Sequence, residues 1–275
     1  MSQFPPAAAK AASGLPPGGL IPRISMRGIK KSFGSIEALR GVDLDLYPGE
    51  CLGLVGDNAA GKSTLTKILS GAYVPDEGEI ILDGSPTRFA NPADARARRI
   101  EMVYQDLSLC DTIDVAGNLF LGREMIAGNS FLGYLDKQHM QIEARRILDG
   151  LEIRIPNLNA TVAQLSGGQR QSIAIARAVA FDPQILIMDE PTSALAVAEV
   201  EAVLALIGRV KALGVSVVLI THRLQDLFRV CDRIAVMYEG TKVAERRIGE
   251  TDLTDLVKLI VGEGHLTSRR VEGRA

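Results

Sequence analysis

A loop bounded by glycines, with a lysine and a serine at its end, carries the clearest chemistry in the sequence. It follows an apolar run at 51–55 and reads Gly56-Asp57-Asn58-Ala59-Ala60-Gly61-Lys62-Ser63, with Thr64 opening a helical stretch. In such a setting backbone N–H groups meet phosphate at a positive helix end, the lysine holds the β- and γ-phosphates, and the serine hydroxyl binds Mg²⁺. An ordinary glycine turn is the alternative, which the flanking strand and helix disfavour. The loop therefore predicts a site for MgATP.

Two adjacent carboxylates follow a second apolar run, at 185–188. Mg²⁺ bridging the phosphates needs oxygen ligands, and Asp189 at the end of the run is the candidate metal ligand. Glu190, the next residue, is the candidate base that polarises the attacking water. Adjacent acids are more often a solvated turn, but here an apolar strand leads directly into them.

Gln105 and His222 also stand where apolar runs end. In a parallel sheet, ligands bind at the carboxyl ends of the strands, so the positions of both residues favour a role at the same site. A lone histidine is otherwise most often structural, and a glutamine that leaves a strand is most often a surface residue. The amide of Gln105 could touch the metal or the water and report the γ-phosphate to the segment that follows.

The elements that must position these residues alternate between strand and helix, which predicts an α/β fold. Strands are expected at 24–30 and 42–46, forming a small antiparallel layer, and at 51–55, 80–82, 99–104, 184–189 and 215–220. Ser166 is expected to cap a helix that runs to Ala180. Another helix should cover 136–151, and a C-terminal helix at 253–260 should stop at Gly262.

Composition limits the remaining possibilities. The chain has 275 residues, 47% of them hydrophobic, and a net charge of −2, so no basic field favours nucleic acid. Three widely spaced cysteines suit a reducing cytoplasm and small core positions. Apolar runs fall short of the ~20 residues that cross a bilayer. Residues 1–22 are expected to be a disordered leader rather than a signal peptide, and 263–275 a flexible tail.

In this order, the motifs resemble those of the nucleotide-binding subunit of an ABC transporter, over 24–262. The resemblance implies a P-loop NTPase core of mixed, mainly parallel sheet with an antiparallel β layer (23–105 and 164–262) and a helical subdomain (106–163, broken at Gly128-Asn129). It makes Gln105 the Q-loop glutamine and a Mg²⁺ contact, Glu190 the catalytic base and His222 the switch histidine. Phe33 would stack on adenine, the alternative being a core aromatic.

The resemblance also assigns the signature, Leu165-Ser166-Gly167-Gly168-Gln169, to the γ-phosphate of an ATP held by a second copy of the chain. Ser166 and the glycine N–H groups at the start of a helix are suited to binding phosphate. The alternative is a flexible loop before a helix with no role in binding. Two positions depart from the family pattern. Ala59 stands where most members have glycine, and would cost roughly 1 kcal/mol if φ is positive there. Ala196 replaces an aspartate that contacts the partner subunit.

Segments 91–95, 103–107 and 118–124 resemble bacterial monosaccharide importers of the ribose, xylose and fructose type. That likeness implies a homodimer on the cytoplasmic face of the inner membrane, working with a permease and an extracytoplasmic sugar-binding protein. Apolar residues of the helical insert would receive a permease helix or, alternatively, pack the insert's own core: Leu107, Leu109, Ile113, Leu119 and Phe120. Two other functions stay open. One is an ABC ATPase of translation or DNA repair, and the other is a nucleotide switch that hydrolyses weakly.

Overall fold

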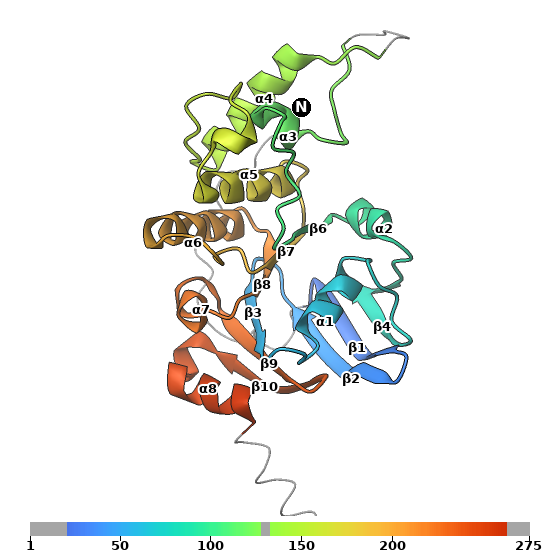
Figure 1. Ribbon diagram of the computed structural model, residues 1–275. Coiled ribbons are helices and arrows are strands. Elements are labelled where there is room, and N and C mark those ends of the chain that lie inside the picture. Colours follow the sequence, from blue (N-terminus) through green and yellow to red (C-terminus); the bar gives the residue numbers. More distant parts are fainter. Residues whose placement is uncertain (1–20, 128–132, 263–275) are drawn as a thin grey trace, which may run out of the picture.

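The computed structural model describes residues 21–127 and 133–262. The expected leader, apart from its last two residues, the tail at 263–275 and the break at Gly128-Asn129 lie outside the described residues. Within them, the predicted α/β architecture is confirmed, with two sheets and helices (Figure 1).

A six-stranded sheet forms the centre of the molecule, in the order β10-β9-β3-β8-β7-β6. Its strands are β3 (Cys51–Gly56), β6 (Ile100–Val103), β7 (Ile185–Asp189), β8 (Ser216–Ile220), β9 (Arg233–Tyr238) and β10 (Thr241–Arg247). All neighbours are parallel except β10, which pairs antiparallel with β9. The sequence analysis did not predict β9 or β10.

Both faces of this sheet are buried, because successive side chains of a strand point to opposite sides. In β8, for example, Val217 and Leu219 belong to one hydrophobic core, while Val218 and Ile220 belong to the other. The same alternation holds in β3, β7 and β9. The continuous apolar runs of the sequence are therefore strands that serve two cores at once.

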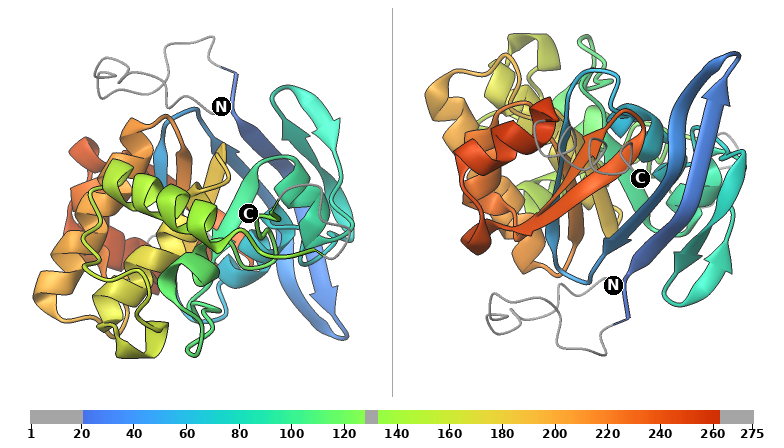
Figure 2. Two further views of the ribbon diagram at one scale, coloured as in Figure 1. Left: turned by 90° about the horizontal axis from the view of Figure 1, so that it is seen from above. Right: turned by 90° about the horizontal axis from the view of Figure 1, so that it is seen from below.

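The core that contains Val218 and Ile220 lies against a four-stranded antiparallel sheet, in the order β2-β1-β4-β5. It comprises β1 (Ile24–Phe33), β2 (Ile36–Leu46), β4 (Glu77–Leu82) and β5 (Ser85–Thr87), and the long β1 and β2 lie along one side of the molecule (Figure 2). Asp83 and Gly84, both with positive φ (47° and 79°), form the β4–β5 turn, as a two-residue hairpin requires. The helices α1 (Lys62–Leu69) and α2 (Pro92–Ala97) complete this layer.

The core that contains Val217 and Leu219 lies on the opposite face of the central sheet. Four helices cover it: α5 (Gly167–Val179), α6 (Val197–Ala212), α7 (Leu224–Val230) and α8 (Leu253–Val261). Gly53 in β3 allows α7 to pack closely against the strand, because a Cβ at this position would lie 2.8 Å from the Leu227 side chain. Helix α8 ends at Gly262 in the left-handed conformation, as predicted. A short turn of 3-10 helix (Ile248–Glu250) joins β10 to it. No helix in residues 21–127 and 133–262 is both long and apolar enough to span a bilayer.

The segment 106–163 contains less helix than expected. Its described part holds α3 (Val115–Leu119), α4 (Lys137–Gly150) and a 3-10 turn (Val162–Gln164), with loops between them. The loop at 110–114 is shaped by Asn118, whose fully buried amide accepts from Cys110 N (2.8 Å) and donates to the carbonyls of Cys110, Ile113 and Asp114. These bonds satisfy the backbone without helix, which apolar periodicity alone does not reveal.

The apolar residues of this segment pack mainly inward. Leu119 and Phe120 are buried in the helical core, and Leu107 and Leu109 are partly buried against it. Packing of the insert's own core therefore accounts for Leu119 and Phe120.

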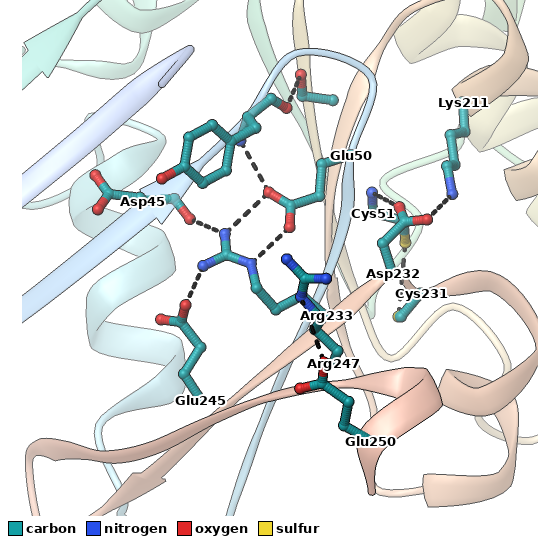
Figure 3. A network of polar contacts seen from close by, with 12 residues as sticks. Asp45, Glu50, Cys51, Lys211, Cys231, Asp232, Arg233, Glu245, Arg247 and Glu250 are labelled. Atoms are coloured by element: carbon teal, nitrogen blue, oxygen red, sulfur yellow. Dashed lines mark hydrogen bonds and ion pairs between the residues drawn. The ribbon is translucent and has the colours of Figure 1, made fainter. Parts of the chain in front are cut away.

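At the amino ends of the parallel strands, Arg233 connects both sheets (Figure 3). Its guanidinium donates twice to the Glu50 carboxylate (2.7 and 2.9 Å), once to the Asp45 carbonyl (2.6 Å) and once to Glu245. Burial alone would lower the pKa of Arg233, but Glu50 and Glu245 raise it above its ordinary value.

Two of the three cysteines lie beside this network. Cys51 and Cys231 are buried, as expected for small core residues, with their Sγ atoms 3.6 Å apart. Cys110 is only partly buried.

Candidate active site

The strand order gathers the predicted site residues at one edge of the central sheet. Strands β3, β8, β7 and β6 are parallel neighbours, and Ile220 is paired with Leu54 on one side and Asp189 on the other. Gly56 ends β3, Asp189 ends β7, Gln105 follows β6 and His222 follows β8. Residues far apart in the sequence thus share the carboxyl edge, where α/β folds bind ligands.

The phosphate loop leads from β3 into α1, and Lys62 is the first residue of that helix. Its Nζ donates to the carbonyls of Gly56 (2.7 Å) and Asp57 (2.9 Å). Burial lowers the pKa of Lys62, and the charges of Asp57, Glu190 and Asp189 partly oppose that shift. The lysine therefore lies over the loop and close to the two carboxylates.

Strand β9, the β9–β10 turn and strand β2 all contact the phosphate loop, and the sequence analysis missed these contacts. Gly240 N donates to the Ala60 carbonyl (3.2 Å), and a Cβ on Gly56 would lie 2.2 Å from the Met237 carbonyl. Gly61 has φ 96°, and its Cβ would lie 2.7 Å from the Ala38 carbonyl. The apolar run at 234–237 followed by Glu239-Gly240 is the strand-and-turn signal that could have found the contacts from β9 and its turn.

Ala59 has a φ of 67°, the left-handed conformation that the sequence analysis considered for it. A non-glycine residue there costs roughly 1–2 kcal/mol. The alanine therefore strains the phosphate loop.

The acidic pair lies where β7 ends. Burial raises the pKa of Asp189, as does neighbouring Glu190, while Lys62 and Lys67 lower it. Glu190 has a positive φ of 50°, and its N–H donates to the Ile220 carbonyl (2.8 Å). Glu190 therefore stands directly after the strand in a left-handed backbone conformation, anchored to the neighbouring strand β8.

His222 contacts the Glu190 side chain directly. Its Nδ1 lies 3.2 Å from Glu190 Oε2, and the imidazole is 64% exposed while the glutamate is 26% exposed. The histidine can therefore hold the carboxylate and still meet a ligand from solvent. The structure brings these two predicted residues together.

The donors predicted for a metal are the Ser63 hydroxyl, the Gln105 amide and the Asp189 carboxylate. These are hard oxygen ligands of the type that suits Mg²⁺, which keeps some of its sites for water and phosphate. Gln105 is exposed. Among the described residues, no group of three or more His, Cys, Asp or Glu side chains could hold a metal alone. The donor set fits a cation that shares its coordination with a nucleotide.

The segment 165–169 forms the start of α5. Ser166 Oγ accepts from Gln169 N (3.3 Å), and Gln169 Oε1 accepts from Ser166 N (3.0 Å), a complete capping box. Within the described residues, no hydrogen bond or ion pair joins 166–169 to the phosphate loop 56–64.

Phe33 lies at the end of β1 and is 42% exposed, so it is not the core aromatic that was the alternative. Its ring makes an edge contact with Tyr73 (centroids 5.2 Å apart), and Lys31 Nζ lies 5.7 Å from its centre. The exposed ring is accessible to a flat ligand.

Comparison with known families identifies this arrangement. The family model described as ABC transporter matches residues 39–193, more than half of the chain. The chain belongs to the ABC transporter family. It is an ATP-binding cassette, and ABC cassettes of this kind are ATPases.

Similar curated proteins are named as import ATP-binding proteins. The chain is 42% identical to a xylose/arabinose import ATP-binding protein of Sulfolobus acidocaldarius, covering 86% of the chain and 93% of that protein. It is 44% identical to a fructose import ATP-binding protein of Rhizobium meliloti, covering 88% and 94%. A ribose import ATP-binding protein of Chromobacterium violaceum is 41% identical over 87% of the chain, which spans about half (47%) of that relative.

Solved ABC cassettes share the fold. A nucleotide-free cassette from an ABC transporter superposes with a TM-score of 0.74 at 26% identity, covering 88% of this chain and 96% of that one. A dimeric cassette in a post-hydrolysis state, bound to ADP and phosphate, gives a TM-score of 0.69 at 27% identity, covering 82% and 98%. The P-loop NTPase fold predicted from the motifs is therefore confirmed.

Proposed function

We propose that this ABC cassette is the ATP-hydrolysing subunit of a bacterial-type importer, and that two copies close on two MgATP to power uptake of a monosaccharide through a separate permease. The contact between Glu190 and His222, beside Lys62 at the strand ends, carries the catalytic part of the proposal. The import relatives named for xylose/arabinose, fructose and ribose support the cargo class.

The residues of this chain divide the catalytic work. Lys62 exchanges its two carbonyl partners for phosphate oxygens, which neutralises their charge where water is scarce. Glu190 accepts a proton from the attacking water, and His222 holds the Glu190 carboxylate. Ser63, Asp189 and Gln105 would hold Mg²⁺, which supplies positive charge to the β- and γ-phosphates when bound. Phe33 would stack on the adenine.

A second copy completes each site in this proposal. Ser166 and Gly167 are exposed at the start of α5, and the start of a helix attracts anions. They share no hydrogen bond with the phosphate loop of their own subunit among the described residues. The dimeric cassette of similar fold supports closure of two chains face to face.

The remaining partners are a permease and an extracytoplasmic sugar-binding protein, with the dimer peripheral on the cytoplasmic face of the membrane. A weakly hydrolysing switch is the second candidate, because Ala59 strains the phosphate loop. ATPase activity with and without the permease separates this switch from a motor.

Reconstitution with the permease and the binding protein tests the function. ATP hydrolysis should rise when one of several pentoses or hexoses is supplied, and Glu190→Gln should abolish the rise. Stimulation by an amino acid or a lipid, with no response to any monosaccharide, would contradict the sugar assignment. Hydrolysis that stays minimal with every cargo would favour the switch.

A further inference from the structure

The Glu199 side chain joins the starts of two helices. Glu199 lies in the first turn of α6, and its Oε1 accepts from Gly168 N at the start of α5 (3.0 Å). Its Oε2 accepts from Ala196 N, at the start of its own helix (3.2 Å). The Ser166 side chain also donates to the carboxylate, and these bonds lower the pKa of Glu199. One carboxylate thus faces two positive helix ends.

Close packing makes this contact specific to the glycine. A Cβ on Gly168 would lie 2.8 Å from both Cβ and Cγ of Glu199, too close for any other residue without a shift. Gly168 is buried, whereas Ser166 and Gly167 are exposed. Glu199 therefore binds the buried Gly168 N–H and the Ser166 side chain, and leaves the exposed Gly167 for a ligand.

The start of α6 depends on the same carboxylate. Its N-cap residue is Ala196, which has no side-chain acceptor. Of the two hydrogen bonds in a capping box, only the one from Ala196 N to the Glu199 carboxylate can therefore form. Ala196 ends the short loop that begins at Glu190. That loop is fixed by Ser193 Oγ, which donates to the Glu190 carbonyl (2.9 Å), and by Thr192 Oγ1, which donates to Asp226 (2.7 Å).

We propose that Glu199 is a positioning residue that fastens the signature turn of α5 to the loop after Glu190. The inference rests on the proposed function, in which Glu190 serves the ATP of its own subunit and Ser166 serves the ATP of the partner. Glu199 therefore holds the signature turn, which serves one ATP site, in a fixed position relative to the loop after Glu190, which serves the other. The carboxylate thereby links the two sites across a chain that has no aspartate at position 196.

The test compares Glu199→Ala with Glu201→Ala. Glu201 is two residues along the same helix and pairs with Arg229 on the surface, so it is a matched control. Both changes are made in a Glu190→Gln chain, and ATP-dependent dimerisation is measured by light scattering against subunit concentration. Binding of a fluorescent ATP analogue to the separate subunit and the melting temperature are measured in parallel. Glu199→Gln, which keeps one acceptor oxygen, is the milder variant if Glu199→Ala folds poorly.

We expect Glu199→Ala to need about ten-fold more subunit for half dimerisation, because it loses bonds to a charged acceptor. Binding of the analogue should match the Glu201→Ala control. The melting temperature should be modestly lower than in the control because α6 loses its cap, and Glu199→Gln should be intermediate. Dimerisation equal to the control would overturn the proposal. Tighter dimerisation would also overturn it, and would mean that the carboxylate only repels the incoming phosphate.

Hydrogen exchange separates this inference from the proposed function. In the single subunit, the amides of Gly168 and Ala196 should lose protection in Glu199→Ala and keep it in Glu201→Ala. Unchanged protection at both amides rejects the link. If the parent Glu190→Gln chain never dimerises with ATP, the proposed sandwich fails, and the exchange result still decides whether Glu199 fastens the two segments.

Discussion

Replacing Arg233 with methionine should strongly destabilise the fold. The guanidinium side chain is 6% exposed, and its bidentate partner Glu50 is 10% exposed. Methionine would fill much of the space but leave the Glu50 carboxylate with one backbone donor, Tyr47 N (2.9 Å). Breaking a buried ion pair in this way costs about 3–5 kcal/mol. For a chain of this size the melting temperature should fall by roughly 6–20 °C.

The loss should depend on pH. Arg233 and Lys242 outweigh burial and hold the pKa of Glu245 below its ordinary 4.5, so the contribution of Glu245 to stability is present above that value. It is lost as the pH falls through the lower pKa of the folded protein. In the variant, Glu245 keeps Lys242 but loses Arg233, so its pKa rises toward the ordinary value. The gap in melting temperature between parent and variant should therefore be largest near pH 7 and shrink toward pH 4.

Thermal melts over that pH range check the prediction, with Lys30→Met as the control. Lys30 pairs with Glu77 on the surface, where an ion pair adds little. The double variant Arg233→Met/Glu50→Met should recover most of the loss, since apolar groups replace both charges. If Arg233→Met melts at the same temperature as Lys30→Met, or the gap grows as the pH falls, the reasoning is refuted.

Two further changes test other parts of the structure. Ala59→Gly should bind ATP up to about five-fold more tightly, because it removes about 1 kcal/mol of strain from the phosphate loop, and Ala59→Val should bind more weakly. Equilibrium titration with ATP measures both affinities. Weaker binding by the glycine variant would contradict the inference that Ala59 is strained. Asn118→Ala should lower the free energy of unfolding by about 2–4 kcal/mol, because buried backbone groups of the 110–114 loop lose their partner. Asn159→Ala, on the surface, is the control and should have little effect. A small difference between the melting temperatures of the two variants would show that water replaces the amide.

Local sequence patterns predicted the helices and strands whose ends are marked by nearby residues, such as a capping residue or the end of an apolar run. Asp136 caps α4 and Leu151 ends it, within a residue of the expected stretch at 136–151. Ser166 caps α5 as predicted, because a serine followed three residues later by glutamine encodes a capping box locally. The four strands that end at site residues were also predicted, since each is a short apolar run.

What the sequence could not show depends on pairing between distant segments. Glu199 reaches Gly168 from 31 residues away, and Arg233 reaches Glu50 from 183 residues away. No local periodicity encodes which acid meets which donor. Helix α6 was missed for a different reason: its apolar positions 200, 203, 204, 207 and 210 have helical spacing, which the motif-led analysis passed over.

Glu190→Gln provides the most direct measurement of the central claim, that two copies close on ATP and that Glu190 activates the water. The amide keeps the shape of the side chain but cannot accept a proton. The variant should bind ATP, form an ATP-dependent dimer and lose nearly all steady-state hydrolysis. A variant that hydrolyses ATP at the parent's rate, or that stays monomeric at saturating ATP, would contradict the account.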